Sequence, residues 1–322
     1  MMIADRRTIL GGLSAAGLSL ALPASALAGK GKPFFKRIGK PIGLQLYTLG
    51  DLPVKDLEGT LASVAKIGFS EIELPNFYNR TPKDLRAAGD KAGVRFSSIH
   101  LNMPGPFNGG SINLLTSPQE LADALNTLEI YQAFLPLCPL PEGFSVPTGG
   151  NVQKAIGDAL LSAGPDHWKR TAQILNERAA ALRPFGIRLG YHNHNMEFQH
   201  LADGQTGWDI LLREVDPALV NFELDLGWVS AAGRDPVTEL GRLKGRVAAV
   251  HVKDVKATTS TNYIMQQVPT EVGSGRLQWS RILPAAQAAG VSHYFVEQEP
   301  PFERDRLAAV AISHGFLSTV VA

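Results

Sequence analysis

A complete strand–helix–strand unit can be read in residues 42–75, IGLQLYTLGDLPVKDLEGTLASVAKIGFSEIELP. Residues 42–48 and 71–75 are short runs rich in residues that favour β-strands. Between them lies a helical pattern of apolar residues that ends at Gly68: Leu57, Leu61, Val64 and Ile67. Strand, helix and strand in this order predict a right-handed βαβ unit with parallel strands.

The same alternation continues to the C-terminus. Eight strand-like runs occur in all, at residues 42–48, 71–75, 95–101, 130–137, 187–194, 221–228, 247–254 and 293–299. Eight βα units in one chain of this length are typical of a (β/α)8 TIM barrel. An open doubly wound sheet would favour a G-x-G-x-x-G loop after its first strand, and residues 44–53 contain none. We therefore predict an α/β chain with a single barrel domain over residues 41–322.

A long irregular piece, residues 139–166, follows the fourth predicted strand. It belongs to the barrel face on which active sites form. We interpret it either as a lid or wall of a substrate site, or as a surface insertion without fixed structure.

The first 28 residues resemble an export signal and not a part of the barrel. Arg6 and Arg7 precede an apolar segment that ends in an A-x-A cleavage pattern at residues 26–28. The paired arginines favour a twin-arginine signal over an ordinary secretory signal or an uncleaved membrane anchor. We therefore expect a periplasmic or secreted protein, with residues 29–40 as a linker before the barrel.

Composition restricts the class of partner. The chain has 44% hydrophobic and 19% charged residues, and its formal net charge is +1. Such a chain buries a sizeable core, but it lacks the basic surface that nucleic acid binding requires. Nor do we expect membrane binding once the signal is cleaved. Cys138 is the only cysteine, so no intrachain disulfide forms. A small molecule is the expected partner.

Ionisable residues gather near the ends of six predicted strands: Glu71, Glu73, His100, His192, His194, Glu223, Asp225, His251, Lys253, Asp254, Glu297 and Glu299. A buried charge is costly unless it is paired or bound to a cation. The C-terminal ends of barrel strands form the active site, so this clustering predicts one shared polar site. Carboxylates and imidazoles without cysteine suit Mn²⁺, Mg²⁺, Co²⁺ or Zn²⁺ and exclude a thiolate zinc site.

Several motifs, taken in order, resemble the sugar phosphate isomerase/epimerase superfamily, the xylose isomerase-like TIM barrels. They are YHNHNMEF, FELDLGWVSAAGRDPV, VHVKD, VGSGRLQW and YFVEQE. The resemblance runs from about residue 40 to the C-terminus and is greatest for a secreted subgroup with YHNH and HVKD motifs. It implies one divalent metal ion, held by residues from strands five to eight. Carried over to this chain, the last three ligands are Asp225, His251 and Glu297.

The fifth strand departs from the family pattern, because His192 stands where the family usually has glutamate. Either His192 replaces that carboxylate, or His194 or Glu197 reaches the metal instead. We interpret His192 as a ligand and His194 as a substrate-binding or relay group. Asp225 and Glu297 still bring two negative charges to a divalent ion.

The resemblance implies isomerisation or epimerisation of a sugar, by proton abstraction α to a carbonyl through a metal-bound enediolate. Glu297 and Glu73 are the candidate bases on opposite faces of the substrate. Lys253 is expected to stabilise an oxyanion or phosphate, or to form a salt bridge with Asp254 or Glu299. Trp228 either stacks on a sugar or packs under a loop. The candidate substrate-binding residues are His100, His194, Glu197, Trp228 and Glu299.

Two alternatives stay open at this point. β-Elimination from a 3-keto-glycoside begins with the same proton abstraction and would make the protein a lyase or hydrolase. Export fits extracellular glycosides better than sugar phosphates. The other alternative is a barrel that binds a sugar without catalysis, against which the joint presence of Asp225, His251 and Glu297 argues.

Overall fold

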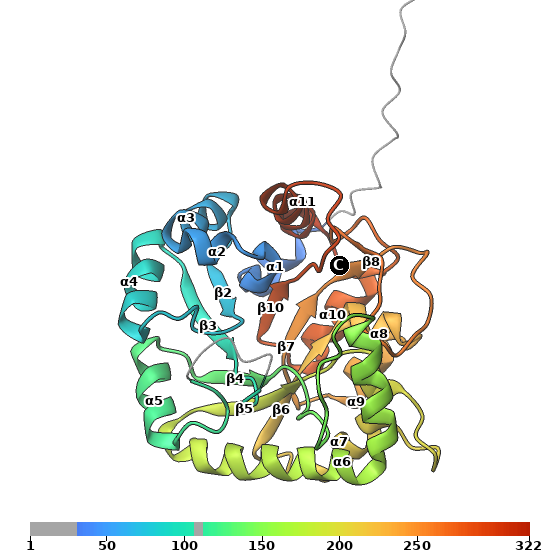
Figure 1. Ribbon diagram of the computed structural model, residues 1–322. Helices are drawn as coiled ribbons and strands as arrows, with labels where there is room; N and C mark the ends of the chain where they lie inside the picture. The colour runs from blue at the N-terminus through green and yellow to red at the C-terminus, as the bar shows by residue number, and fades with distance from the viewer. Residues whose placement is uncertain (1–30, 106–111) are drawn as a thin grey trace, which may run out of the picture. The chain divides into compact units, whose positions relative to one another are not determined.

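The eight predicted strands close into a parallel barrel (Figure 1). The structure, a computed structural model, describes residues 31–105 and 112–322. Neighbours pair in the order β1-β10-β7-β6-β5-β4-β3-β2, always in parallel. The TIM-barrel prediction is therefore confirmed. The strands are β1 (Gly43–Gln45), β2 (Glu71–Leu74), β3 (Arg95–His100), β4 (Gln132–Leu135), β5 (Arg188–His192), β6 (Val220–Asp225), β7 (Val247–Val252) and β10 (His293–Val296).

Helices surround the barrel on its outside (Figure 1). The longer ones are α3 (Leu57–Ile67), α4 (Pro82–Ala92), α5 (Pro118–Thr127), α6 (Val152–Leu182), α7 (Gly207–Glu214), α9 (Pro236–Arg242), α10 (Trp279–Ala289) and α11 (Arg306–Thr319). Shorter elements are α1 (Phe34–Ile38), α2 (Leu52–Lys55), α8 (Leu226–Ala231), the 3-10 turns η1 (Leu46–Leu49), η2 (Arg183–Phe185) and η3 (Met196–Phe198), and the antiparallel pair β8 (Asp254–Val255) and β9 (Pro269–Thr270). Among the described residues, no helix is both long and apolar enough to span a membrane.

Local sequence explains where these helices begin and end. The Thr81 side chain accepts a hydrogen bond from the Asp84 backbone N–H at the start of α4. Ser117 caps α5 through the Glu120 N–H in the same way. These contacts satisfy backbone donors that have no partner within the helix. α4 ends at Gly93, whose left-handed φ of 73° favours glycine.

The predicted linker at residues 29–40 needs correction in its described part. Residues 34–38 form α1, and the side chains of Phe34 and Phe35 are buried. Both rings contact Tyr294 of β10 edge-on, with centroids 6.2 and 5.3 Å away. This segment therefore packs on the barrel, because two adjacent phenylalanines gain more from burial than from exposure. Residues 1–30, with the predicted signal peptide, lie outside the described residues.

The piece predicted to be irregular, residues 139–166, is helical from Val152 onward. It forms the first part of α6, which bends at Gly164 (φ 67°) before Pro165. Three of its side chains line the pocket described below: Val152, Gln153 and Ile156. Of the two interpretations, the wall of a pocket agrees with the structure, and an insertion without fixed structure does not.

The barrel interior is filled in layers along the strands. Phe134, Ala249 and Phe295 form a small apolar cluster inside it. Alternate residues of a strand face the same side, so His251 and Glu297 lie one layer closer to the C-terminal ends. The His251 ring centroid is 6.5 Å from that of Phe295. The polar site therefore rests on an apolar layer.

Asp254, the first residue of β8, holds the loop that contains VGSGRLQW. Its carboxylate accepts five hydrogen bonds of 2.8–3.2 Å, from the indole of Trp279 and from the backbone N–H groups of Val255, Gly273, Gly275 and Leu277. Asp254 is therefore not a salt-bridge partner of Lys253, although it was one of the two partners that the sequence suggested. The glycines of this motif let the backbone approach the carboxylate closely.

Gly275→Ala is expected to lower the free energy of unfolding by about 1–3 kcal/mol, the usual cost of overpacking. An added Cβ would overlap the Asp254 carboxylate and lie 2.5 Å from the Val255 carbonyl oxygen. Gly241→Ala is the matched control, since a Cβ there meets no atom within 4 Å. Urea unfolding measures both variants. Equal stability of Gly275→Ala and the wild type would refute the close contact.

Candidate functional site

A cavity of about 320 Å³ opens where the barrel strands end. Apolar side chains of the strand ends and of α6 form part of its wall, among them Leu137 and Ile156. Its ionisable lining residues are Tyr47, His100, His192, His194, Glu297 and Glu299. Five of these six were expected at the site from sequence. The cavity therefore lies on the face where barrels carry their active sites.

Asp225, His251 and Glu297 form a group that we call the mouth set. They lie on the adjacent strands β6 and β7 and just after β10. One donor atom of each lies within 4.8 Å of the others. His251 Nδ1 is 2.9 Å from Glu297 Oε2 and 3.5 Å from Asp225 Oδ2. The structure thus brings together the three ligands that the resemblance implies.

Lys253 contacts the mouth set with a fully buried ammonium group. Its Nζ lies 2.6 Å from Glu297 Oε2, 2.9 Å from Asp225 Oδ2 and 3.1 Å from Glu299 Oε1. Burial opposes the charge, but the three carboxylates outweigh it and hold the pKa of Lys253 above its ordinary value. The salt bridge expected with Glu299 is therefore present.

A second group, the floor set, consists of His100, His192, Glu223 and His251. Three imidazole nitrogens approach Glu223 Oε2: His100 Nε2 at 2.9 Å, His192 Nδ1 at 3.1 Å and His251 Nε2 at 3.2 Å. Burial lowers the pKa of His100, but Glu73 and Glu223 raise it further, to about 9. His192 was expected beside Asp225 and Glu297, and the structure groups its donor atom with Glu223 instead.

The donor chemistry of both sets fits a divalent cation. The side chains of the mouth and floor sets are at most 9% exposed. Glu223 Oε1 is buried and has no hydrogen-bond partner in the described part of the chain. A buried carboxylate oxygen without a partner is costly unless a cation or water reaches it. Mixed carboxylate and imidazole donors are ligands for ions such as Mn²⁺, Mg²⁺, Co²⁺ and Zn²⁺.

The expectation that Glu73 acts as a base needs correction. Its carboxylate is fully buried and does not line the cavity. It accepts hydrogen bonds from Gln45 Nε2 at 2.8 Å and from the Ser98 hydroxyl, and His251 Nε2 lies 2.7 Å from it. With its oxygens engaged by donors, Glu73 orients His251 and does not reach a substrate.

Trp228 is 1% exposed, so it does not offer a face to a sugar. Its ring packs against Lys253, whose Nζ is 4.8 Å from the ring centroid, and against His194 at 5.7 Å. The packing alternative is therefore the correct one. A cation over an indole face is itself a favourable contact.

His194 lines the cavity, as expected for a substrate-binding group. Its Nδ1 is buried and has no hydrogen-bond partner in the described part of the chain. Burial, and then the Lys253 ammonium, lowers the pKa of His194 to about 3, so the ring is neutral near pH 7. A neutral ring with a free nitrogen is suited to a hydrogen bond with a bound hydroxyl or carbonyl.

Glu197 does not reach the cavity and is neither a ligand nor a substrate contact. It is fully buried and accepts hydrogen bonds from the Tyr191 hydroxyl at 2.8 Å and the His194 backbone N–H at 3.0 Å. Burial raises the pKa of Glu197 to about 7. Its role in this structure is to hold the segment that carries His194.

Glu197→Gln is expected to flatten the pH dependence of stability. The folded protein keeps the Glu197 proton up to about pH 7, whereas the unfolded chain loses it near 4.5. Stability therefore falls as pH rises through this window, by about 2–3 kcal/mol between pH 5 and 8. Urea unfolding at both pH values should show a smaller fall in the variant. The control is Glu177→Gln on the exposed face of α6, and a wild-type slope in Glu197→Gln would contradict the assignment.

Glu71 lies at the other end of the barrel, although it is only two residues from Glu73. It begins β2 and pairs with Arg95 at 2.7 Å and His293 at 2.9 Å. Arg95 and His293 line a separate cavity of about 510 Å³. Glu71 is therefore not part of the predicted site.

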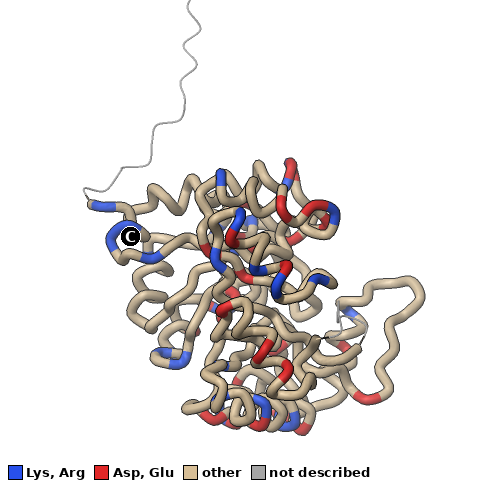
Figure 2. The backbone as a smooth tube through the Cα atoms, turned by 90° about the vertical axis from the view of Figure 1, so that its left-hand side faces the viewer, with Lys and Arg blue, Asp and Glu red and all other residues tan. Residues whose placement is uncertain are grey.

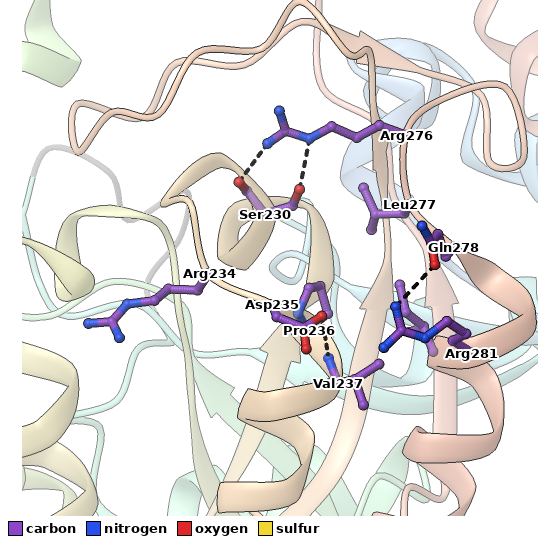
Figure 3. A pocket seen from close by; sticks show the side chains of 10 residues that line it. Ser230, Arg234, Asp235, Pro236, Val237, Arg276, Leu277, Gln278 and Arg281 are labelled. Carbon is purple, nitrogen blue, oxygen red and sulfur yellow. Dashed lines mark hydrogen bonds between the residues drawn. The ribbon is translucent and has the colours of Figure 1, made fainter.

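A further cavity, of about 200 Å³, lies between α8, α9 and α10 (Figure 3). Arg276 at its edge donates to Ser230 Oγ at 3.0 Å, to the Ser230 carbonyl at 2.6 Å and to the Thr259 carbonyl at 2.8 Å. These three hydrogen bonds occupy the Arg276 guanidinium and connect α8 to the loop after β8.

Comparison with known proteins identifies the family. Residues 61–318 match the family described as xylose isomerase-like TIM barrel. The chain belongs to this family. It is 25% identical over 291 residues to an inosose dehydratase of Lacticaseibacillus casei, covering 82% of this chain and 91% of that protein. An inosose dehydratase of Geobacillus thermodenitrificans is 26% identical over 294 residues, with 82% and 91% covered. A solved sugar phosphate isomerase/epimerase from Parabacteroides distasonis has a TM-score of 0.67 at 25% identity, covering 87% and 94%.

Several residues that organise this xylose isomerase-like site carried no predicted role. Glu223 stands at a predicted strand end, and its spacing from Asp225 already indicated an inward side chain. Gln45 is a polar residue at the end of the first strand, where the same rule applies. Asn193 accepts a hydrogen bond from the Asp225 N–H at 3.0 Å, and Tyr47 lines the cavity. No feature of the sequence marks Asn193 or Tyr47 as a site residue.

Proposed function

We propose that this protein removes a proton α to the carbonyl of a keto sugar or keto-cyclitol and expels the substituent β to it, with a divalent metal ion held by the mouth set. The observation that carries this proposal is the mouth set itself. Three buried donors converge there, and one of them, Glu297, lines a cavity large enough for a sugar ring. Buried donors beside a cavity are the usual arrangement of a metal-dependent active site.

When bound, the ion would polarise the carbonyl and stabilise the negative charge left by proton removal. Lys253 keeps Asp225 and Glu297 oriented through its contacts of 2.9 and 2.6 Å. Glu299 lines the cavity next to Glu297, so either carboxylate is placed to take the α proton. His194, from the segment after β5, offers a hydrogen bond to a substrate oxygen.

Elimination is favoured over proton exchange between two bases. A two-base epimerase needs a second carboxylate across the substrate, and Glu73 is buried and fully engaged. The carboxylates that line the cavity, Glu297 and Glu299, both follow β10. In an elimination one base takes the proton, the C–H electron pair forms the new C=C bond, and the β substituent leaves with its bonding pair. Two relatives are named inosose dehydratases, and loss of water from a ring ketone is such a reaction.

Isomerisation or epimerisation is the second candidate. It is supported by the structural likeness to a protein named sugar phosphate isomerase/epimerase. In that reaction the proton returns and every substituent is retained. His194, which lines the same cavity from the segment after β5, is then the second group besides Glu297 and Glu299 for the proton exchange.

Product analysis tests the two candidates directly. The full chain with Mn²⁺ is incubated with a 3-keto-glucoside and, separately, with inosose and free ketohexoses. Release of the aglycone or of water, with an unsaturated ketone that absorbs in the ultraviolet, is the expected result. A substrate epimer with all substituents retained would favour the second candidate instead. Binding of the sugars without any turnover would support a non-catalytic sugar-binding barrel.

A further inference from the structure

We propose that the amino-terminal end of the barrel binds a small molecule through a phosphate or carboxylate group. The site is the cavity of about 510 Å³ that Arg95, Arg188 and His293 line, at the opposite end of the barrel from the mouth set. This cavity and the one at the mouth have different lining residues. The proposal therefore does not depend on the reaction at the mouth.

The first residues of four strands supply the polar side chains of this cavity. Arg95, Gln132, Arg188 and His293 begin β3, β4, β5 and β10, and all four line it. β3, β4 and β5 are neighbouring strands (Figure 1). Alternate residues of a strand face the same side, so Arg188 faces the barrel interior as His192 does further along β5. The two arginines are therefore directed into one cavity from strands that flank β4.

Arg188 supplies a positive charge that no carboxylate balances. Within residues 31–105 and 112–322 its exposed side chain forms no hydrogen bond and no ion pair. Glu129, which also lines the cavity, pairs with Arg86 at 2.9 Å, and Glu71 pairs with Arg95 at 2.7 Å. Each of these glutamates thus has an arginine of its own. An anion in the cavity would be the counter-charge of Arg188.

Ser97 gives an independent sign of a ligand. Its hydroxyl oxygen is buried and has no hydrogen-bond partner in the described part of the chain. It lies two residues after Arg95 on β3, and both side chains line the cavity. A buried hydroxyl without a partner is costly. An anion held by the arginines would accept the hydrogen bond that this hydroxyl can donate.

Arg95 is oriented for a contact with an anion. Its Nη2 donates to Glu71 Oε1 at 2.7 Å, and His293 Nδ1 lies 2.9 Å from the same oxygen. The Nε and Nη1 groups of Arg95 keep their donors, since no bond from them occurs in the described chain. Guanidinium donors match the planar oxygens of a carboxylate or the oxygens of a phosphate. A neutral sugar would offer no counter-charge, so the ligand class is an oxyanion.

An apolar layer separates this cavity from the active site. Phe134, Ala249 and Phe295 form the layer, and Ala248, which packs against it, lines the cavity. The His293 ring lies parallel to that of Phe295, with centroids 5.9 Å apart. The anion would thus lie on the far side of this layer from the mouth set. It is a ligand distinct from the substrate.

The size of the cavity indicates an organic anion. A volume of about 510 Å³ exceeds what one phosphate or carboxylate group fills and lies within the range of about 300–1,000 Å³ for small-molecule sites. The hydroxyl-bearing side chains of Tyr131 and Ser292 line it as well. Hydroxyl groups can bind the uncharged part of such a ligand. We therefore expect a small organic phosphate or carboxylate to fill the site.

Isothermal titration calorimetry of the full-length protein tests the site, with inorganic phosphate and malonate as separate probes and no added metal ion. The wild type should bind one anion per chain. Arg188→Gln should weaken binding at least about tenfold, because a hydrogen bond between charged groups is lost. Ser97→Ala should weaken it less, since its hydroxyl is uncharged. Arg183→Gln is the matched control, because Arg183 is also exposed, lies shortly before Arg188 and does not line the cavity.

The probe that binds more tightly identifies the group on the natural ligand, phosphate or carboxylate. Failure of both anions to bind the wild type would overturn the proposal. Equal binding by Arg188→Gln and Arg183→Gln would also overturn it, because the anion would then lie elsewhere, for example at the mouth. A wild type that binds the anion through Arg188 but converts none of the keto sugars would contradict the proposed function and leave this site standing.

Discussion

Replacing Glu297 by glutamine is expected to lower kcat by about 10²–10⁴-fold, the range for loss of an acid–base group. The change removes a charge from the mouth set and removes one of the two carboxylates that face the cavity. Glutamine keeps the size of the side chain, so the fold should survive. Steady-state kinetics on the substrate that is turned over, with metal content measured in parallel, tests this result.

The matched control for this variant is Glu271→Gln. Glu271 is also a buried carboxylate, but it pairs with Arg304 at 2.7 Å and does not line the cavity. We expect its kcat to stay within about twofold of the wild type, because no group at the reacting atoms changes. A Glu297→Gln enzyme as active as this control would remove Glu297 from the reaction.

Lys253→Met is expected to lower the free energy of unfolding by about 3–5 kcal/mol in the presence of a chelator. This is the usual cost of removing one partner of a buried ion pair. Methionine fills a similar volume but leaves Asp225, Glu297 and Glu299 without their ammonium partner. Added Mn²⁺ should restore more stability to the variant than to the wild type, since the ion then provides the missing charge. Urea unfolding with and without Mn²⁺ measures both effects.

Lys256→Met serves as the control for Lys253→Met. Lys256 pairs with Glu303 at the surface, where an ion pair contributes at most about 1 kcal/mol. Over the described chain, acidic and basic residues are interspersed (Figure 2), so removing one such charge changes little. If Lys253→Met loses no more stability than Lys256→Met, the three carboxylates do not need Lys253.

The barrel could be predicted from sequence because its signal is repeated eight times. Each strand is a short apolar run, and the alternation with helical segments leaves few possible topologies. The end of each strand was harder to predict, because the residues that follow a strand have the same mixture of apolar and polar side chains as the strand itself. The run at 42–48, for example, becomes a three-residue strand followed by the turn η1.

The set of site residues was predictable, but their depth was not. Glu71 and Glu73 share one strand and one face, yet they belong to opposite ends of the barrel. Sequence spacing gives the face of a strand, whereas depth depends on the stagger between strands in the closed sheet. For the same reason His192 was expected with Asp225 and lies with Glu223. Trp228 was ambiguous because only the tertiary contact with Lys253 shows that its ring is covered.

The central claim is metal-dependent removal of a proton α to a carbonyl, and the fate of the α hydrogen in D₂O tests it most directly. The full-length protein loaded with Mn²⁺ is incubated with the same keto sugars and inosose, and the α C–H signal is followed by NMR. We predict that this signal is lost, either by exchange with deuterium in the substrate or by elimination to the unsaturated ketone, and that the loss stops on chelation and in Glu297→Gln. Retention of the α hydrogen in all of these ketones, with a protein that retains its metal, would contradict the account.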